Sequence, residues 1–271
     1  MDDATPYEKM PEFDLDDARF DQPSPASRED IRSFVICTTP RSGSWLLCRQ
    51  LVNAGIGVPS EYFNFLHATP LCARWQVDPR DTRAYLNRLR ARRTTRNGAF
   101  GTKLLWTQYV GRRSAIKVEL LGRSVLVFLH REDVAQQAVS LHLSHRTGIW
   151  DFDGRVSTPP RSDIPWGDPA HLDSCDRSIR LHNQYWRELF SSRRIDPIAV
   201  RYEDFVADQR GTIVQIADAL GLGAGDYRVP PAEPRDSAFP AEIEAQRREL
   251  VQRWRAMVES RRAGTARAAP G

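Results

Sequence analysis

The chain has 271 residues, of which 41% are hydrophobic, and this predicts one sizeable core in a single globular domain with appendages. Its longest strongly apolar run, 124–129, is far shorter than the roughly 20 residues of a membrane helix, so we expect no membrane span. All but three of its 39 basic residues are arginine, which suits bidentate phosphate recognition. We therefore expect an anionic ligand.

The charge is distributed unevenly. Residues 1–30 carry ten acidic and three basic side chains, a charge of −7, which leaves +11 on the remainder. This start lacks the basic and apolar stretches of a signal peptide, so a cytoplasmic protein is expected. We interpret residues 1–31 as an acidic extension that buries too little apolar surface to order itself, 32–262 as the main domain and 263–271 as a flexible tail.

The four cysteines are Cys37, Cys48, Cys72 and Cys175. They form no C-x-x-C pair and have no histidine partner at zinc-finger spacing. We therefore expect free thiols, with neither a disulfide scaffold nor a zinc site.

Apolar runs and amphipathic segments alternate along the chain. In order, the sequence predicts a strand at 34–37, a helix at 44–54, a helix capped by Asp78 with Tyr85, Leu86 and Leu89 on its apolar face, strands at 100–105 and 124–130, a helix from Asp133, a long loop at 147–173, a helix through 179–190, a strand at 198–202, a helix through 213–220 and a helix at 241–258. Such alternation indicates a three-layer α/β/α fold with a central, mostly parallel sheet.

A loop with phosphate-binding chemistry follows the first predicted strand. Backbone N–H groups and the helix dipole favour an anion at this turn. Gly43 lets the backbone approach a ligand, Arg41 offers a charged fork, and the Ser42 and Ser44 hydroxyls can donate to phosphate oxygens. The same serines also suit an ordinary helix cap. The loop lacks the lysine of G-x-x-x-x-G-K-[ST], which argues against a triphosphate like that of ATP.

Arg131 is a second candidate for anion binding. It directly follows the carboxyl end of the predicted strand 124–130, and open α/β sheets bind their ligands at that edge. Nine residues later, Ser140 shares a polar stripe with Asp133 and Gln137 on the next predicted helix. A stripe of this kind is also typical of a solvated helix face, and the spacing leaves open whether Arg131 and Ser140 meet.

Together these two elements resemble the phosphate-binding elements of sulfotransferases. More closely, the chain resembles the bacterial trehalose sulfotransferase family between residues 34 and 222. The matching segments are 41–44, 60–63, 101–106, 130–133, 137–140 and 146–150. The family loop usually continues with threonine where this chain has Trp45, whose indole can stack on adenine or close the pocket.

The resemblance implies a sulfotransferase that takes its sulfuryl group from 3′-phosphoadenosine-5′-phosphosulfate (PAPS), releases 3′-phosphoadenosine-5′-phosphate (PAP) and requires no metal. It implies that residues 41–45 hold the 5′-phosphosulfate, and that Arg131 and Ser140 hold the 3′-phosphate. The acceptor is expected to be a hydroxyl of a carbohydrate or glycosylated small molecule, and the protein to be a homodimer.

Glu61 is the candidate general base, because it matches the acidic residue expected in that role in the family. Its neighbours Tyr62, Phe63 and Phe65 are expected to form an apolar wall that raises its pKa. Lys103 can place its ammonium near the sulfuryl or bridging oxygen, or extend from a strand end to solvent.

Arg41 is the third candidate for catalysis, expected to stabilise charge on the leaving phosphate. His67 and His130 are alternative bases. The residues expected to line the acceptor pocket are Tyr62, Phe63, Trp106, Gln108 and Trp150, although each tryptophan also suits a buried core.

Two other functions stay open on the sequence alone. An ATP-dependent small-molecule kinase on a similar sheet predicts transfer from ATP with magnesium. A non-catalytic nucleotide or nucleic-acid binder predicts steeply salt-dependent binding to polynucleotides. The chain has no interleaved aromatic and basic motif, so we expect no nucleic-acid partner.

Overall fold

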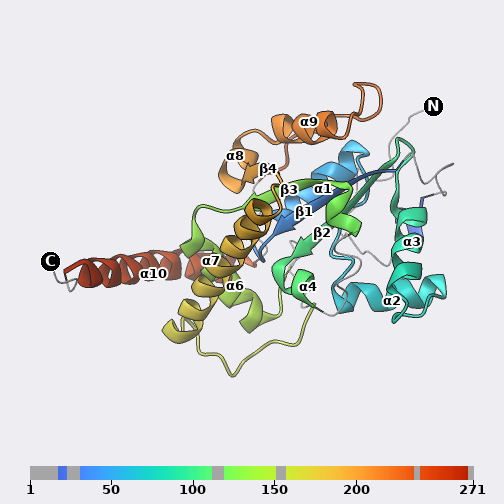
Figure 1. The fold of residues 1–271 in the computed structure, drawn as a ribbon. Helices are drawn as coiled ribbons and strands as arrows, with labels where there is room; N and C mark the ends of the chain where they lie inside the picture. Colours follow the sequence, from blue (N-terminus) through green and yellow to red (C-terminus); the bar gives the residue numbers. More distant parts are fainter. Residues whose placement is uncertain (1–17, 23–30, 112–118, 151–156, 235–238, 268–271) are drawn as a thin grey trace. The chain divides into compact units, whose positions relative to one another are not determined.

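A four-stranded parallel sheet organises the computed structural model (Figure 1). The strands are β1 (Arg32–Thr38), β2 (Ala99–Leu105), β3 (Ser124–His130) and β4 (Ile198–Arg201), in the order β2-β1-β3-β4. All three pairings are parallel, which confirms the predicted sheet. The structure describes residues 18–22, 31–111, 119–150, 157–234 and 239–267, with side chains up to residue 260.

Helices connect and flank the strands. They are the 3-10 helix η1 (Ala18–Phe20) and the α-helices α1 (Ser44–Ala54), α2 (Phe65–Trp75), α3 (Thr82–Arg93), α4 (Trp106–Val110), α6 (Val134–Thr147), α7 (Pro169–Ser192), α8 (Tyr202–Ala207), α9 (Gln209–Ala219) and α10 (Ala241–Arg267). Among the described residues, none of these helices is long and apolar enough to span a membrane.

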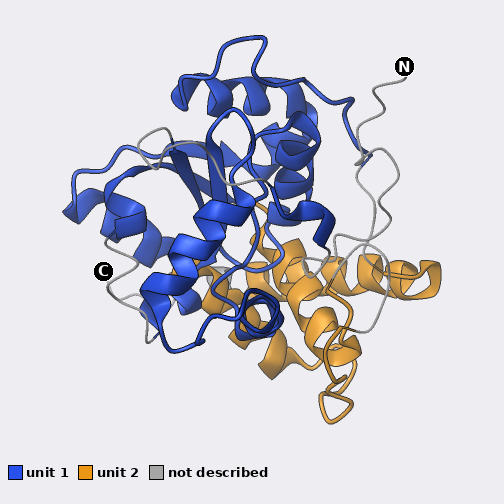
Figure 2. Ribbon diagram, turned by 90° about the vertical axis from the view of Figure 1, so that its right-hand side faces the viewer, with its two compact units in different colours: residues 1–130, 183–234 blue, residues 131–182, 235–271 orange. Residues whose placement is uncertain are grey.

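The chain forms two compact units, which Figure 2 distinguishes. Unit 1 comprises residues 1–130 and 183–234 and contains the whole sheet; unit 2 comprises 131–182 and 235–271. The two halves of α7 therefore belong to different units.

Unit 1 buries apolar side chains on both faces of its sheet. Phe34 and Ile36 of β1 pack in one cluster with residues of α1 and α9, whereas Val35 and Cys37 pack in another with residues of α2 and α3. Because successive residues of a strand point to opposite faces, helices cover both sides. The predicted three-layer α/β/α arrangement is thus confirmed.

Unit 2 is helical in its described part. Residues of α6 and α10 share an apolar cluster that includes Val139, Leu143 and the fully buried Trp254. A second cluster joins α6 to α7 through Ala138, Leu141, Cys175 and Ile179. Asp133, the N-cap of α6, also forms an ion pair with Arg255 of α10.

Several boundaries differ from the predictions. Asp81, and not Asp78, caps α3, because its carboxylate accepts from the Ala84 N–H at 2.9 Å. Helix α7 begins at Pro169, inside the segment expected to be a loop, and Tyr202 begins α8 instead of ending a strand. Helix α10 extends beyond the predicted residue 258 to Arg267, and α2 was not predicted at all.

Part of the acidic N-terminal segment is ordered, contrary to expectation. Phe20 is fully buried beside Val52 and Val58. Asp21 accepts a hydrogen bond from the Trp75 indole at 2.9 Å and forms a 2.9 Å ion pair with Arg93. One aromatic side chain and one buried ion pair therefore hold residues 18–22 against unit 1.

The four cysteines are free and buried, which confirms that none forms a disulfide. Burial raises the pKa of the Cys48 thiol, the larger effect, and nearby Lys103 lowers it and Glu61 raises it, with a net value of about 12. Cys48 is therefore a neutral thiol at physiological pH, as befits a core residue.

Candidate active site

The loop between β1 and α1 has an unusual backbone. Arg41 and Gly43 both lie in the left-handed region, with φ of 62° and 88°. At Gly43 a side chain has no room, since a Cβ atom there would lie 2.2 Å from Cδ2 of Tyr202. Gly43 is also the N-cap of α1 and offers no side-chain cap, so the start of this helix suits an anion.

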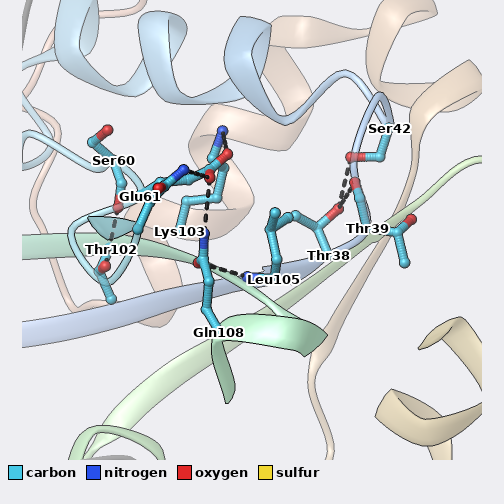
Figure 3. Close-up of polar contacts among 10 residues, drawn as sticks. Thr38, Thr39, Ser42, Ser60, Glu61, Thr102, Lys103, Leu105 and Gln108 are labelled. Carbon is cyan, nitrogen blue, oxygen red and sulfur yellow. Dashed lines mark hydrogen bonds and ion pairs between the residues drawn. The ribbon is translucent and has the colours of Figure 1, made fainter. Parts of the chain in front are cut away.

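Ser42 ties this loop to the sheet. Its buried hydroxyl lies 2.7 Å from the Thr38 hydroxyl (Figure 3). The Thr38 hydroxyl in turn donates to the Leu129 carbonyl at 2.7 Å. Because Thr38 has one hydroxyl hydrogen, Ser42 is the donor to Thr38. The Trp186 indole N–H donates to the Thr38 carbonyl at 3.0 Å. The Ser42 hydroxyl therefore holds the loop to the end of β1, and its binding to a phosphate stays a prediction.

Glu61 is the centre of a polar cluster near the carboxyl end of β2 (Figure 3). The Lys103 ammonium lies 2.7 Å from its Oε1 atom, and both side chains are largely buried. The amides of Gln108 and Asn64 donate to its Oε2 atom at 2.8 Å and 3.2 Å. The structure therefore brings together two of the predicted catalytic residues, Glu61 and Lys103.

Hydrogen bonds between β2 and the segment before Glu61 fix the backbone positions of Glu61 and Lys103. The Lys103 N–H donates to the Ser60 carbonyl at 2.8 Å, and the Thr102 hydroxyl donates to the same oxygen at 3.1 Å, so the segment before Glu61 lies along β2. Parallel pairing sets Lys103 opposite Ile36, two residues before Thr38 on β1. The carboxyl ends of β1 and β2 thus deliver the loop and the ion pair to one edge.

Gln108 has a positioning role that the sequence did not reveal. Its Oε1 atom accepts from the Leu105 N–H at 3.1 Å at the start of α4, so its NH₂ group must face Glu61. Asn64 acts similarly at the start of α2, where its side-chain oxygen Oδ1 accepts from the Leu66 backbone N–H at 3.1 Å. An Asn just before a helix is a recognisable N-cap, and that signal was available at Asn64.

The expected apolar wall around Glu61 is wrong. Tyr62 is buried in the core with its hydroxyl donating to the Val58 carbonyl, and Phe65 is 75% exposed. Burial does raise the pKa of Glu61, but the Lys103 charge and hydrogen bond, with smaller contributions from His67 and Asn64, outweigh it. The pKa of Glu61 falls from 4.5 to about 2.

The aromatic residues expected around an acceptor lie in both units. In unit 1, the Trp106 ring contacts Tyr109, Tyr185 and Trp186 at centroid distances of 5.1, 5.2 and 5.0 Å. Phe63 packs edge-on against Tyr85 at 6.5 Å. In unit 2, the Trp150 indole donates to the Thr158 hydroxyl at 2.8 Å. Trp45 is partly buried against the cluster that contains Phe34.

Arg131 and Ser140, the expected 3′-phosphate ligands, both belong to unit 2. Arg131 lies two residues before Asp133, the N-cap of α6, and donates through Nη2 to the Gln136 side chain. Ser140 lies further along α6, and both residues are buried. His130, an alternative base, packs against Phe128 with a centroid distance of 5.2 Å in unit 1.

Comparison with known proteins assigns the chain to a family. The model of the family described as Stf0 sulphotransferase matches residues 33–257, most of the chain. The chain belongs to the Stf0 sulphotransferase family. The protein is therefore a sulfotransferase.

Two relatives of this sulfotransferase are named trehalose 2-sulfotransferase. A trehalose 2-sulfotransferase from Mycobacterium tuberculosis is 28% identical over 229 residues, covering 70% of this chain and 85% of that protein. One from Mycolicibacterium smegmatis is 25% identical over 227 residues, covering 70% and 84%. Among solved structures, a sulfotransferase from Alicyclobacillus acidocaldarius is similar with a TM-score of 0.45 and 14% identity, covering 84% of this chain and 96% of that one.

Gly43→Ala tests the packing of the loop between β1 and α1. We expect a loss of unfolding free energy from two causes, the left-handed backbone, about 1–2 kcal/mol, and the collision with Tyr202, about 1–3 kcal/mol more. Gly55→Ala is the matched control, because Gly55 has φ of 77° but no atom within 4 Å of its would-be Cβ. Denaturant titration should show a larger loss for Gly43→Ala, and equal losses would contradict the proposed collision.

The low pKa of Glu61 makes one contribution to stability dependent on pH. A carboxylate whose pKa is 4.5 when unfolded and about 2 when folded stabilises the sulfotransferase above pH 4.5 and loses that contribution as the pH falls toward 2. Glu61→Gln lacks this titration. The difference in unfolding free energy between wild type and Glu61→Gln should therefore shrink from pH 5 to pH 2 (about that range) in denaturant titrations; a constant difference would refute the lowered pKa.

Proposed function

We propose that this sulfotransferase moves the sulfuryl group of PAPS to a hydroxyl of a carbohydrate or glycosylated small molecule, with Glu61 as general base. The observation that carries the proposal is the buried Lys103–Glu61 pair, 2.7 Å apart, at the sheet edge that also bears the β1–α1 loop. A cation for the leaving side of sulfur and a carboxylate for the acceptor side are the two groups that in-line transfer requires.

Residues 41–45 are the proposed binding site for the 5′-phosphosulfate. The start of α1 offers backbone N–H groups with a favourable dipole, and Arg41 adds a charged fork. Ser42 holds the loop in shape, while Ser44 and Trp45 complete its surface. Arg131 and Ser140 are proposed to bind the 3′-phosphate, as the family resemblance implies.

Glu61 and Lys103 act in sequence in this proposal. With a pKa of about 2, Glu61 is ionised but weakly basic while Lys103 is paired with it. When the Lys103 ammonium turns to the oxygen atoms around sulfur, Glu61 loses its main cation and its pKa rises. Glu61 then accepts the hydroxyl proton as the new O–S bond forms and the S–O bond to the 5′-phosphate breaks.

In unit 1 the acceptor is proposed to lie against Phe63, Trp106 and Gln108, because aromatic rings stack well on sugars. For Trp150 of unit 2, a role in acceptor binding is proposed from the family resemblance alone. Tyr62 is left out of this surface, since it is fully buried. The two relatives named trehalose 2-sulfotransferase support a sugar acceptor. We further propose, from the family resemblance, a homodimer in the cytoplasm, which sedimentation of the purified chain and cell fractionation would test.

Release of PAP tests this function. The purified chain is incubated with PAPS and a panel of hydroxylated acceptors that includes trehalose, other disaccharides and glycosides. We expect PAP and a sulfated product from a sugar-containing acceptor without ATP or magnesium. Transfer only from ATP, or only to acceptors without a sugar, would overturn the proposal.

A further inference from the structure

A cluster of histidine and cysteine side chains lies between two helices of unit 2, apart from the groups discussed above. Helix α6 contributes His142 and His145, three residues apart, and α7 contributes His171 and Cys175, four residues apart. Both spacings put the two side chains on one face of their helix.

Three members of this cluster have the geometry of a metal site. One ligand atom each of His145, His171 and Cys175 lies within 4.8 Å of the other two, and Cys175 Sγ is 3.7 Å from His171 Nδ1. Tetrahedral zinc, with bonds of about 2.0–2.3 Å, holds its ligand atoms roughly 3.3–3.8 Å apart. Small side-chain rotations are enough to reach that spacing.

The state of His145 is an independent sign of a ligand. Its Nδ1 atom is buried and has no hydrogen-bond partner among the residues that the structure describes. Its ring packs edge-on against Trp150 and His171, at centroid distances of 5.4 and 5.3 Å. A buried ring nitrogen normally finds a partner, and a metal ion at the centre of the cluster supplies one.

The hydrogen bonds of His142 set the tautomers of the cluster in the absence of an ion. The Gly167 N–H donates to its Nε2 atom at 3.2 Å, so the neutral ring carries its hydrogen on Nδ1. That hydrogen points to Nδ1 of His171, 2.9 Å away. In the ion-free form the lone pair of His171 Nδ1 accepts this hydrogen, so the neutral His171 ring carries its own hydrogen on Nε2. An ion bound at Nδ1 would take the place of the hydrogen bond from His142.

Nearby charges do not forbid a cation. Arg161, which acts on His145 and His171, is itself paired with Asp163 at 3.0 Å. The Asp168 carboxylate accepts from the backbone N–H of His171 at 3.3 Å and adds negative charge near the cluster. The donor set of two imidazoles and one thiolate is soft, which favours zinc over magnesium or calcium.

We propose that His145, His171 and Cys175 bind one Zn²⁺ ion that joins α6 to α7. The Cys175 thiol releases its proton on binding, and three protein ligands leave the fourth position for water. The ion would hold the end of α6 to the start of α7, because His145 lies near the end of α6 and His171 lies near the start of α7. The proposed zinc site does not rest on the proposed sulfuryl transfer, although Trp150, a proposed acceptor residue, packs against His145.

Metal titration of the full, tag-free chain tests this site. After dialysis against metal-free buffer, we expect one equivalent of Zn²⁺ by competition with a coloured chelator, and Co²⁺ should give a thiolate-to-cobalt charge-transfer band. Cys175→Ala should lose that band and at least about 100-fold of zinc affinity. His145→Gln should lose affinity but keep the band. Cys72→Ala, which removes another buried thiol, is the control and should behave as wild type.

The outcomes separate clearly. A wild-type chain that takes up no zinc, or a cobalt spectrum without the thiolate band, overturns the site. So does Cys175→Ala that binds zinc as tightly as wild type. If circular dichroism shows that Cys175→Ala is unfolded, His145→Gln decides, because undiminished affinity in that variant refutes the proposed ligand set.

Discussion

Glu61→Gln is expected to lower kcat by about 10²–10⁴-fold, because the amide keeps the shape of the side chain but cannot accept the hydroxyl proton. Donor affinity should change little, since the proposed donor ligands lie on other residues. Steady-state PAP release at saturating substrates measures turnover, and calorimetry with PAP measures donor-site binding.

The control for this substitution is Glu119→Gln. Glu119 is another unit 1 carboxylate in an ion pair, 2.6 Å from Arg90, but it is not part of the Glu61 cluster. It should keep wild-type turnover. If Glu61→Gln also turned over at the wild-type rate, another group would have to be the base.

Lys103→Met should lower kcat by about 10²–10³-fold, the usual effect of removing one donor that stabilises transition-state charge. It should also destabilise the fold by about 3–5 kcal/mol, because the largely buried Glu61 carboxylate loses its cation. Lys103→Arg keeps the charge and should retain part of the turnover. The measurements are single-turnover rates and thermal unfolding.

A double variant distinguishes these two effects. Lys103→Met combined with Glu61→Gln removes both charges, so its unfolding free energy should exceed that of Lys103→Met alone, while its turnover stays low. If the double variant were less stable than Lys103→Met, the ion pair would not be the source of the destabilisation.

The strands could be predicted from sequence because parallel strands are continuous apolar runs. The prediction at 124–130 matches β3, and β1 and β2 differ from their predictions by one or two residues. Helix α2 could not be predicted in this way. It begins with the exposed Phe65 and contains Pro70, so it has neither a clean apolar stripe nor an uninterrupted run of helix formers.

The site was predicted less completely than the fold. Local chemistry made Arg41 and Gly43 candidates for anion binding, and the structure gives both a left-handed backbone at the start of α1; their role stays a prediction. The pKa of Glu61 was predicted in the wrong direction, since its sequence neighbours are aromatic whereas its spatial neighbour Lys103 is 42 residues away. A contact between the segment before α2 and a residue of β2 has no local signal in the sequence.

The hydrogen-bond chain from Ser42 through Thr38 to Leu129 links the anion loop to β3. The shape of the loop is thereby fixed when the sheet folds, and a ligand that docks there has little disorder to remove. The amide hydrogen of Thr38, the last residue of β1, should then exchange with solvent about as slowly as those of the rest of the strand, and only openings that separate β1 from β3 should expose it.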